Sequence, residues 1–174
     1  MYAIAIDVGV KNLGICIFDF TSAKVVLWDN VNMTDGRYMP TKNVDYVRAL
    51  VARYSQYFEN ATALIVERQM RCNMRIIEAV LQTMYYPICI VVDPRAVKLH
   101  YALSMKNYRL NKAKAVEWAV DFLARNPQAF EPAALNIFET HKKRDDLADS
   151  LLMVLYYLDT YSNQLNVSSS DVGL

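Results

Sequence analysis

The sequence has too few cysteines for a fold that depends on disulfide bonds or on a structural metal site. Its 174 residues include three cysteines, Cys16, Cys72 and Cys89, an odd number without metal-ligand spacing. A disulfide framework or structural zinc site would need more thiols at closer intervals. We therefore expect reduced, mostly buried thiols in an intracellular compartment. With 4 Gly and 5 Pro, the chain also lacks low-complexity sequence.

Long hydrophobic runs are absent as well. The longest apolar stretches, residues 85–92 and 151–158, are shorter than the roughly 20 residues that span a bilayer. Asp7 interrupts the apolar N-terminal run, which argues against a signal peptide. We expect a soluble protein without a membrane partner.

What remains is a globular composition, with 54% hydrophobic and 21% charged residues. A chain of this length forms one domain and buries a sizeable core. We assign residues 1–162 to a single domain and expect residues 163–174, which are polar and serine-rich, to form a flexible tail.

The charge is balanced overall but uneven along the chain. The net charge is +1, yet residues 68–114 carry nine basic and two acidic side chains, a net +7, which leaves −6 for the remainder. Such a basic middle is either an ordinary solvated face or a surface that faces phosphates. Tyrosines interleave with these basic residues and could stack on unpaired bases; they are Tyr85, Tyr86, Tyr101 and Tyr108.

The hydrophobic pattern changes period along the chain. Three strand-like segments come first, followed by helix, strand, helix, strand and two further helices. These segments occupy residues 2–8, 13–20, 24–29, 44–58, 62–66, 76–84, 87–92, 112–123 and 145–158. A meander followed by right-handed crossovers predicts an α/β fold. Its mixed sheet would have a three-strand antiparallel meander plus two parallel strands flanked by helices, the order of an RNase H-like core.

Four acidic residues stand at positions that such a fold would bring together. Asp7 ends the first strand and Glu67 ends the fourth, and these strands are neighbours in the expected sheet. Asp146 and Asp149 lie three residues apart on one face of the last helix. Asp149 falls on the side that should be buried.

Each of these acids also has a simpler explanation. Asp7 could be a turn or cap residue, and Glu67 could form a surface ion pair with Arg68. Asp145 and Asp146 suit the first turn of a helix, where acids complement the helix dipole. Their joint placement nevertheless favours a common site.

Clustered carboxylates raise one another's pKa, and divalent cations relieve the repulsion. Oxygen ligands select Mg²⁺, with Mn²⁺ able to substitute. Two such ions can activate a water and stabilise the leaving oxygen of a phosphodiester. We therefore expect two Mg²⁺ ions in the active site and no small-molecule cofactor.

Three segments resemble the motifs of RuvC-like Holliday junction resolvases, which belong to the RNase H-like superfamily. Residues 5–14 (AIDVGVKNLG) resemble the first motif, and the Lys-Asn pair is similar to the resolvases of poxviruses and other large DNA viruses. Residues 65–69 (IVERQ) resemble the second motif, and residues 142–151 (KKRDDLADSL) the C-terminal one. Sugar kinases and actin-like ATPases share a similar first motif, but they need two such domains and a far longer chain.

The resemblance implies a metal-dependent, structure-selective endodeoxyribonuclease. It would act as a homodimer and resolve four-way (Holliday) and other branched DNA junctions by paired nicks during recombination and the processing of replication intermediates. The implied catalytic and metal-binding residues are Asp7, Glu67, Asp146 and Asp149, with a capping role for Asp145.

The resemblance also implies a lysine near the scissile phosphate. Lys98, Lys112 and Lys114 are the candidates, and we favour Lys114. The residues we expect to contact DNA are Lys11, Arg68, Arg71, Arg75, Lys98, Lys112, Lys143 and Arg144.

Two other functions stay open at this point. A non-catalytic junction-binding module would keep the fold without cutting, although all four carboxylates are present. An RNase H-like nuclease acting on RNA or RNA–DNA hybrids would keep the site and change the substrate. The apolar helix at residues 76–84 is either a dimer face or a core helix. A viral protein would act at the replication site in the host cell; otherwise we expect a mitochondrial or cytoplasmic location.

Overall fold

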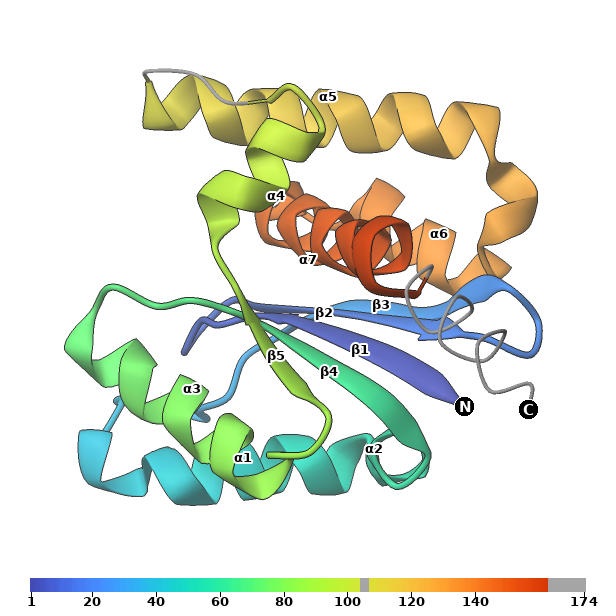
Figure 1. The fold of residues 1–174 in the computed structure, drawn as a ribbon. Helices are drawn as coiled ribbons and strands as arrows, with labels where there is room; N and C mark the ends of the chain where they lie inside the picture. Colours follow the sequence, from blue (N-terminus) through green and yellow to red (C-terminus); the bar gives the residue numbers. More distant parts are fainter. Residues whose placement is uncertain (104–106, 163–174) are drawn as a thin grey trace, which may run out of the picture.

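Five strands form one mixed sheet in the order β3-β2-β1-β4-β5 (Figure 1). The computed structural model describes residues 1–103 and 107–162; the tail expected at 163–174 lies outside this range. β1 pairs antiparallel with β2, as β2 does with β3, whereas β1, β4 and β5 run parallel. The predicted α/β sheet is therefore confirmed. The strands are β1 Tyr2–Asp7, β2 Leu13–Asp19, β3 Lys24–Val31, β4 Ala61–Glu67 and β5 Cys89–Val92.

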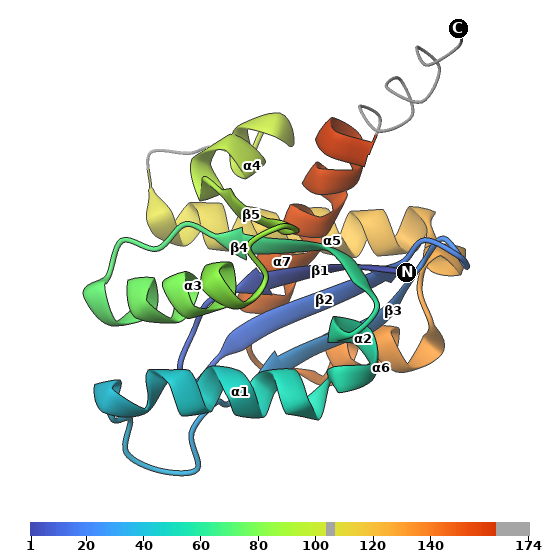
Figure 2. The same ribbon diagram turned by 60° about the horizontal axis from the view of Figure 1, so that its bottom comes forward.

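Helices cover both faces of the sheet (Figures 1 and 2). On one face lie α1 Asn43–Arg53, α2 Ser55–Phe58 and α3 Cys72–Met84. On the other lie α4 Pro94–His100, α5 Tyr108–Arg125, α6 Pro132–Thr140 and α7 Arg144–Tyr157. In this layer α7 packs directly on the strands and α5 packs on α7. Among the described residues, no helix is both long enough and apolar enough to cross a bilayer.

The sequence pattern missed two of these helices. α4 has only seven residues, too few for a periodic apolar stripe to stand out. Two residues nevertheless mark the start of α4. Pro94 occupies its first turn, and the Asp93 carboxylate caps the helix by accepting a 2.8 Å hydrogen bond from the Arg95 backbone N–H. α6 likewise begins with a proline, Pro132. The helix predicted at residues 44–58 is interrupted at Tyr54, which separates α1 from α2.

The central strand β1 is apolar on both faces because helices cover both sides. Ala3 and Ala5 face α7, whereas Ile4 and Ile6 face α1 and α3. Small residues beneath α7 let this helix lie close to the sheet. The start of α7 is fixed further by Trp28 of β3, whose Nε1–H donates a 2.8 Å hydrogen bond to the Leu147 carbonyl.

A glycine permits the closest approach between the sheet and α7. A Cβ placed on Gly14 of β2 would lie 2.2 Å from the carbonyl oxygen of Asp146. This oxygen belongs to the backbone of a packed helix, so it cannot turn aside as a flexible side chain would. Gly14 therefore allows the first turn of α7 to lie over the start of β2.

We predict that Gly14→Ala lowers the free energy of unfolding by about 1–3 kcal/mol, as expected for overpacking a closely packed site. Chemical denaturation measures the loss. Gly36→Ala is the matched control, because a Cβ at Gly36 meets no atom within 4 Å. Equal free energies of unfolding for Gly14→Ala and Gly36→Ala would show that α7 shifts to make room for the Cβ without a loss of stability.

Candidate active site

Asp7 and Glu67 lie side by side at the ends of two adjacent parallel strands. The register of β1 and β4 pairs Ile6 with Val66, one residue before each acid. Both side chains line a cleft of about 740 Å³, and Asp146 and Asp149 of α7 line the same cleft. The structure thus brings together all four carboxylates that the sequence singled out.

The two aspartates of α7 are largely buried. The side chains of Asp146 and Asp149 are 14% and 12% exposed. The Asn30 side-chain amide, on the edge strand β3, approaches Asp146 Oδ2 at 3.5 Å. Sequence reasoning missed Asn30, because nothing in a strand's local pattern reveals that its neighbour Gly14 carries it to the start of α7.

Two lysines balance the charge of these carboxylates. Lys98 of α4 places its Nζ 3.2 Å from Asp149 Oδ1 and donates a 3.4 Å hydrogen bond to Oδ2. Lys112 of α5 forms an ion pair with Asp145 and lies 3.5 Å from Asp146 Oδ1. The N-cap position of α7 is Lys143, without a side-chain capping bond. Asp145 thus stands in the first turn, as expected, but its carboxylate is paired with Lys112.

Burial and neighbouring carboxylates raise the pKa of Asp7 and of Asp149. Burial, followed by the charges of Glu67, Asp149 and Asp146, holds the pKa of Asp7 well above its ordinary value. Burial also raises the pKa of Asp149 from 3.8 to about 6, with Lys98 opposing and Glu67 adding to the rise.

The adjacent acids of α7 behave differently from each other. Burial and the neighbouring Asp145 raise the pKa of Asp146, against the opposing effect of Lys112. Burial acts on Asp145 in the same direction, but its hydrogen bond and ion pair with Lys112 lower its pKa overall. Lys112 therefore lowers the pKa of Asp145 below its ordinary value, whereas the pKa of Asp146 stays raised although the same lysine lies near it.

The donors in the cleft fit hard divalent metal ions. Four carboxyl groups converge there, and Asp149 Oδ1 is buried without a hydrogen-bond donor aligned on it. In the described part of the chain, no three Asp, Glu, His or Cys side chains are yet arranged as a metal site. The ammonium groups of Lys98 and Lys112 instead neutralise the carboxylates, so metal binding would require these ion pairs to open.

The other basic residues expected to contact DNA divide into separate groups. Lys11, Arg71 and Lys143 are exposed and line the same cleft, as do Lys98 and Lys112, and Arg95 joins them. Arg75 lies in a groove on α3. The remaining residues, including the favoured lysine, are exposed and line neither cavity: Arg68, Arg144 and Lys114.

Solved structures share this fold. The fowlpox virus resolvase in complex with Holliday junction DNA matches with a TM-score of 0.68 and 20% identity, over 92% of this chain and 98% of its own. The yeast mitochondrial Holliday junction resolvase matches with a TM-score of 0.66 and 21% identity, over 94% and 85%. RuvC of Thermus thermophilus, in complex with a Holliday junction substrate, gives 0.56 and 16%, over 93% and 97%.

The sheet order, its antiparallel and parallel pairs and the match to these structures define the class of the fold as RNase H-like. Within that class, the chain belongs to the poxvirus A22 protein family, whose model matches residues 1–161. This confirms the resemblance to poxvirus resolvases. A search of curated proteins gave no match.

The raised pKa of Asp149 predicts a pH-dependent stability for the metal-free protein. A carboxyl group with a raised folded-state pKa favours folding when protonated, and this contribution is lost as pH rises through about 6. Because one pKa unit corresponds to about 1.4 kcal/mol, Asp149→Asn should stabilise the protein above pH 7 by up to about 3 kcal/mol. The difference should vanish near pH 4.

Denaturation in a chelating buffer at pH 4 and pH 8 measures this effect. Asp145→Asn is the matched control and should act in the opposite direction at pH 8, because the pKa of Asp145 is lowered by its pairing with Lys112. Destabilisation of equal size by both variants at pH 8 would contradict the interpretation.

Proposed function

We propose that this chain is a metal-dependent endodeoxyribonuclease that resolves four-way and other branched DNA junctions by paired nicks. The observation that carries the proposal is the convergence of Asp7, Glu67, Asp146 and Asp149 in one cleft bordered by basic side chains. Membership of the poxvirus A22 family supports it. The reaction would serve recombination and the processing of replication intermediates, at the site of viral replication inside the host cell.

In this proposal the four carboxylates hold two Mg²⁺ ions, which Mn²⁺ can replace. Bound metal supplies an activated water and neutralises charge on the phosphate during phosphodiester hydrolysis. The chain itself orients the ligands: β1 and β4 present Asp7 and Glu67 from a rigid sheet, and Asn30 orients Asp146. Lys11, Arg71 and Lys143 attract the DNA backbone along the cleft.

The geometry favours Lys98 and Lys112 over Lys114 as the lysine that acts at the scissile phosphate. Both ammonium groups already contact carboxylates of the cleft, whereas Lys114 is exposed and outside it. With metal bound to those carboxylates, the ion pairs of both lysines would weaken, and either ammonium group could then donate to a phosphate oxygen. Their attachment to two different helices lets them approach the DNA from separate positions.

The decisive experiment is cleavage of a labelled synthetic four-way junction in Mg²⁺. We expect paired nicks near the branch point, and Asp146→Asn should lower the rate by about 100-fold or more, since even changes outside the ligand shell cost metal sites 10–100-fold. Lys112→Ala should also impair cleavage, with Lys114→Ala as its matched control on α5. Linear duplex should remain uncut.

Two comparisons distinguish the alternative functions: junction binding against junction cleavage in Mg²⁺ or Mn²⁺, and cleavage of an RNA–DNA hybrid against cleavage of the junction. Binding of the junction without cleavage in Mg²⁺ or Mn²⁺ would identify a non-catalytic junction-binding module. Cleavage of the hybrid alone would keep the metal site and identify an RNase H-like nuclease.

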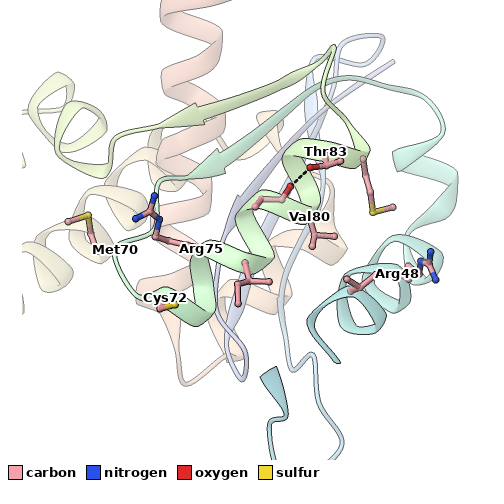
Figure 3. Close-up of a pocket in the computed structure, with 10 residues that line it drawn as sticks. Arg48, Met70, Cys72, Arg75, Val80 and Thr83 are labelled. Atoms are coloured by element: carbon pink, nitrogen blue, oxygen red, sulfur yellow. Dashed lines mark hydrogen bonds between the residues drawn. The ribbon is translucent and has the colours of Figure 1, made fainter. Parts of the chain in front are cut away.

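We further propose a homodimer, formed through an apolar groove between α1 and α3 (Figure 3). The groove has a volume of about 730 Å³. Four of its large apolar side chains are more than 40% exposed: Val44, Met70, Ile76 and Met84. Figure 3 shows Arg75 and Arg48 toward opposite sides of the groove, with Val80 between them.

A second copy of the chain is the occupant that this groove fits best. Clustered exposed apolar surface of this kind marks protein interfaces. Nearly two-fold symmetric junction DNA requires two clefts for paired nicks, and a two-fold dimer supplies them. Helix α3 also buries Ile77 and Leu81 in the core. In this proposal α3 is therefore both a core helix and a dimer face, the two alternatives that the sequence left open.

Ile76→Glu should convert the protein from a dimer into a monomer of 20.0 kDa, because the charge would be buried at the contact. Sedimentation equilibrium measures the mass, and junction products should change from paired to single nicks. Val120→Glu is the control, since Val120 of α5 is exposed to nearly the same extent, 43% against 41%. A wild-type monomer, or a dimer that survives Ile76→Glu, would contradict this interface.

A further inference from the structure

Glu67 is held by a residue that the site has not yet accounted for. The Gln69 side-chain amide donates a 2.9 Å hydrogen bond to Glu67 Oε2 and approaches the Glu67 carbonyl oxygen at 3.2 Å. One amide group therefore contacts both the carboxylate and the backbone of the same residue. This arrangement fixes the side chain of Glu67 relative to the end of β4.

Gln69 is in turn fixed by an acid from α3. Glu78 Oε2 accepts a 2.7 Å hydrogen bond from the Gln69 backbone N–H. One residue earlier, the Arg68 backbone N–H donates to the Val92 carbonyl of β5 at 2.8 Å. The chain that leaves β4 is thus tied to β5 on one side and to α3 on the other.

Such restraint is needed because Glu67 lies against another acid. Asp7 ends the adjacent parallel strand β1, and the side chains of Asp7 and Glu67 line the same cleft. A glutamate side chain has several rotatable bonds, so without a restraint it could turn away from this position. The amide of Gln69 opposes that motion, because it stabilises the carboxylate in its present position.

We propose that Gln69 and Glu78 are positioning residues that hold Glu67 ready for divalent metal, with Glu78 acting through Gln69. The inference rests on the proposed metal site and extends it to two residues outside the carboxylate cluster. Gln69 orients the carboxylate directly, and Glu78 holds the backbone from which Gln69 projects. Hydrogen-bond partners of metal ligands typically change metal affinity or activity by about 10–100-fold when removed.

The test measures Mn²⁺ binding to the full-length protein without DNA, by titration followed with electron paramagnetic resonance. Gln69→Ala and Glu78→Ala should each weaken Mn²⁺ binding by about 10-fold or more. Glu78→Gln keeps an oxygen that accepts from the Gln69 N–H, so it should recover most of the affinity. Gln82→Ala, an exposed glutamine on α3, should bind Mn²⁺ as the wild type does.

A second readout separates positioning from DNA contact, since Gln69 also lines the cleft. Junction affinity measured without divalent metal should be unchanged in Gln69→Ala, whereas the Mg²⁺ concentration needed for cleavage should rise. Weakened junction binding with normal Mn²⁺ affinity would overturn the inference and make Gln69 a DNA contact. Equal Mn²⁺ affinity of Glu78→Ala and Glu78→Gln would show that Glu78 does not position Glu67 through Gln69.

These outcomes are independent of the proposed reaction. If the wild-type protein binds Mn²⁺ but cuts no branched DNA, the junction-resolving function fails while the positioning of Glu67 is still measured by the titration. If cleavage occurs and Gln69→Ala binds Mn²⁺ normally, the function stands and the positioning role fails.

Discussion

The mutual repulsion of carboxylates buried at one end of the sheet is the constraint on which this structure depends. Asp7 is partly buried at the end of β1, and Glu67, Asp146 and Asp149 share its cleft. Burial penalises each charged form, and each neighbour adds to the penalty. Two lysines from separate helices, Lys98 of α4 and Lys112 of α5, form ion pairs with these carboxylates. The charge balance of the cleft therefore ties segments together that are distant in sequence.

The same constraint explains features of the fold that carry no charge. The acids of α7 reach those of the sheet because the helix start lies almost in contact with β2, where Gly14 leaves room for a backbone carbonyl. Trp28 then secures that start through its hydrogen bond to Leu147 and its stacking on Phe138 at 4.4 Å. Packing thus imposes a proximity that electrostatics alone would oppose.

Much of this arrangement follows from local sequence. A strand that ends in an acid is visible from its pattern, and the parallel pairing of β1 with β4 was predicted from the order of the elements. Lys98, Lys112 and Lys114 could not be ranked in this way, because their positions depend on how α4 and α5 pack on α7. Asn30 could not be identified because its partner, Asp146, is brought near it by sheet pairing and helix packing. Gln69 stands in the second motif, but the rotamer that turns its amide onto Glu67 cannot be derived from spacing.

The partial neutralisation of the cleft has a consequence for how stability and activity relate. Lys98 reduces the pKa rise of Asp149 without cancelling it, so the metal-free fold retains unfavourable charge. A ligand that removes this charge binds the folded state preferentially and therefore stabilises it. Divalent metal would do so directly. Phosphate oxygens of the DNA backbone would then accept hydrogen bonds from the two lysines whose ion pairs the metal weakens. Metal and DNA would then favour each other's binding beyond any direct contact between them, because both replace the same two ion pairs.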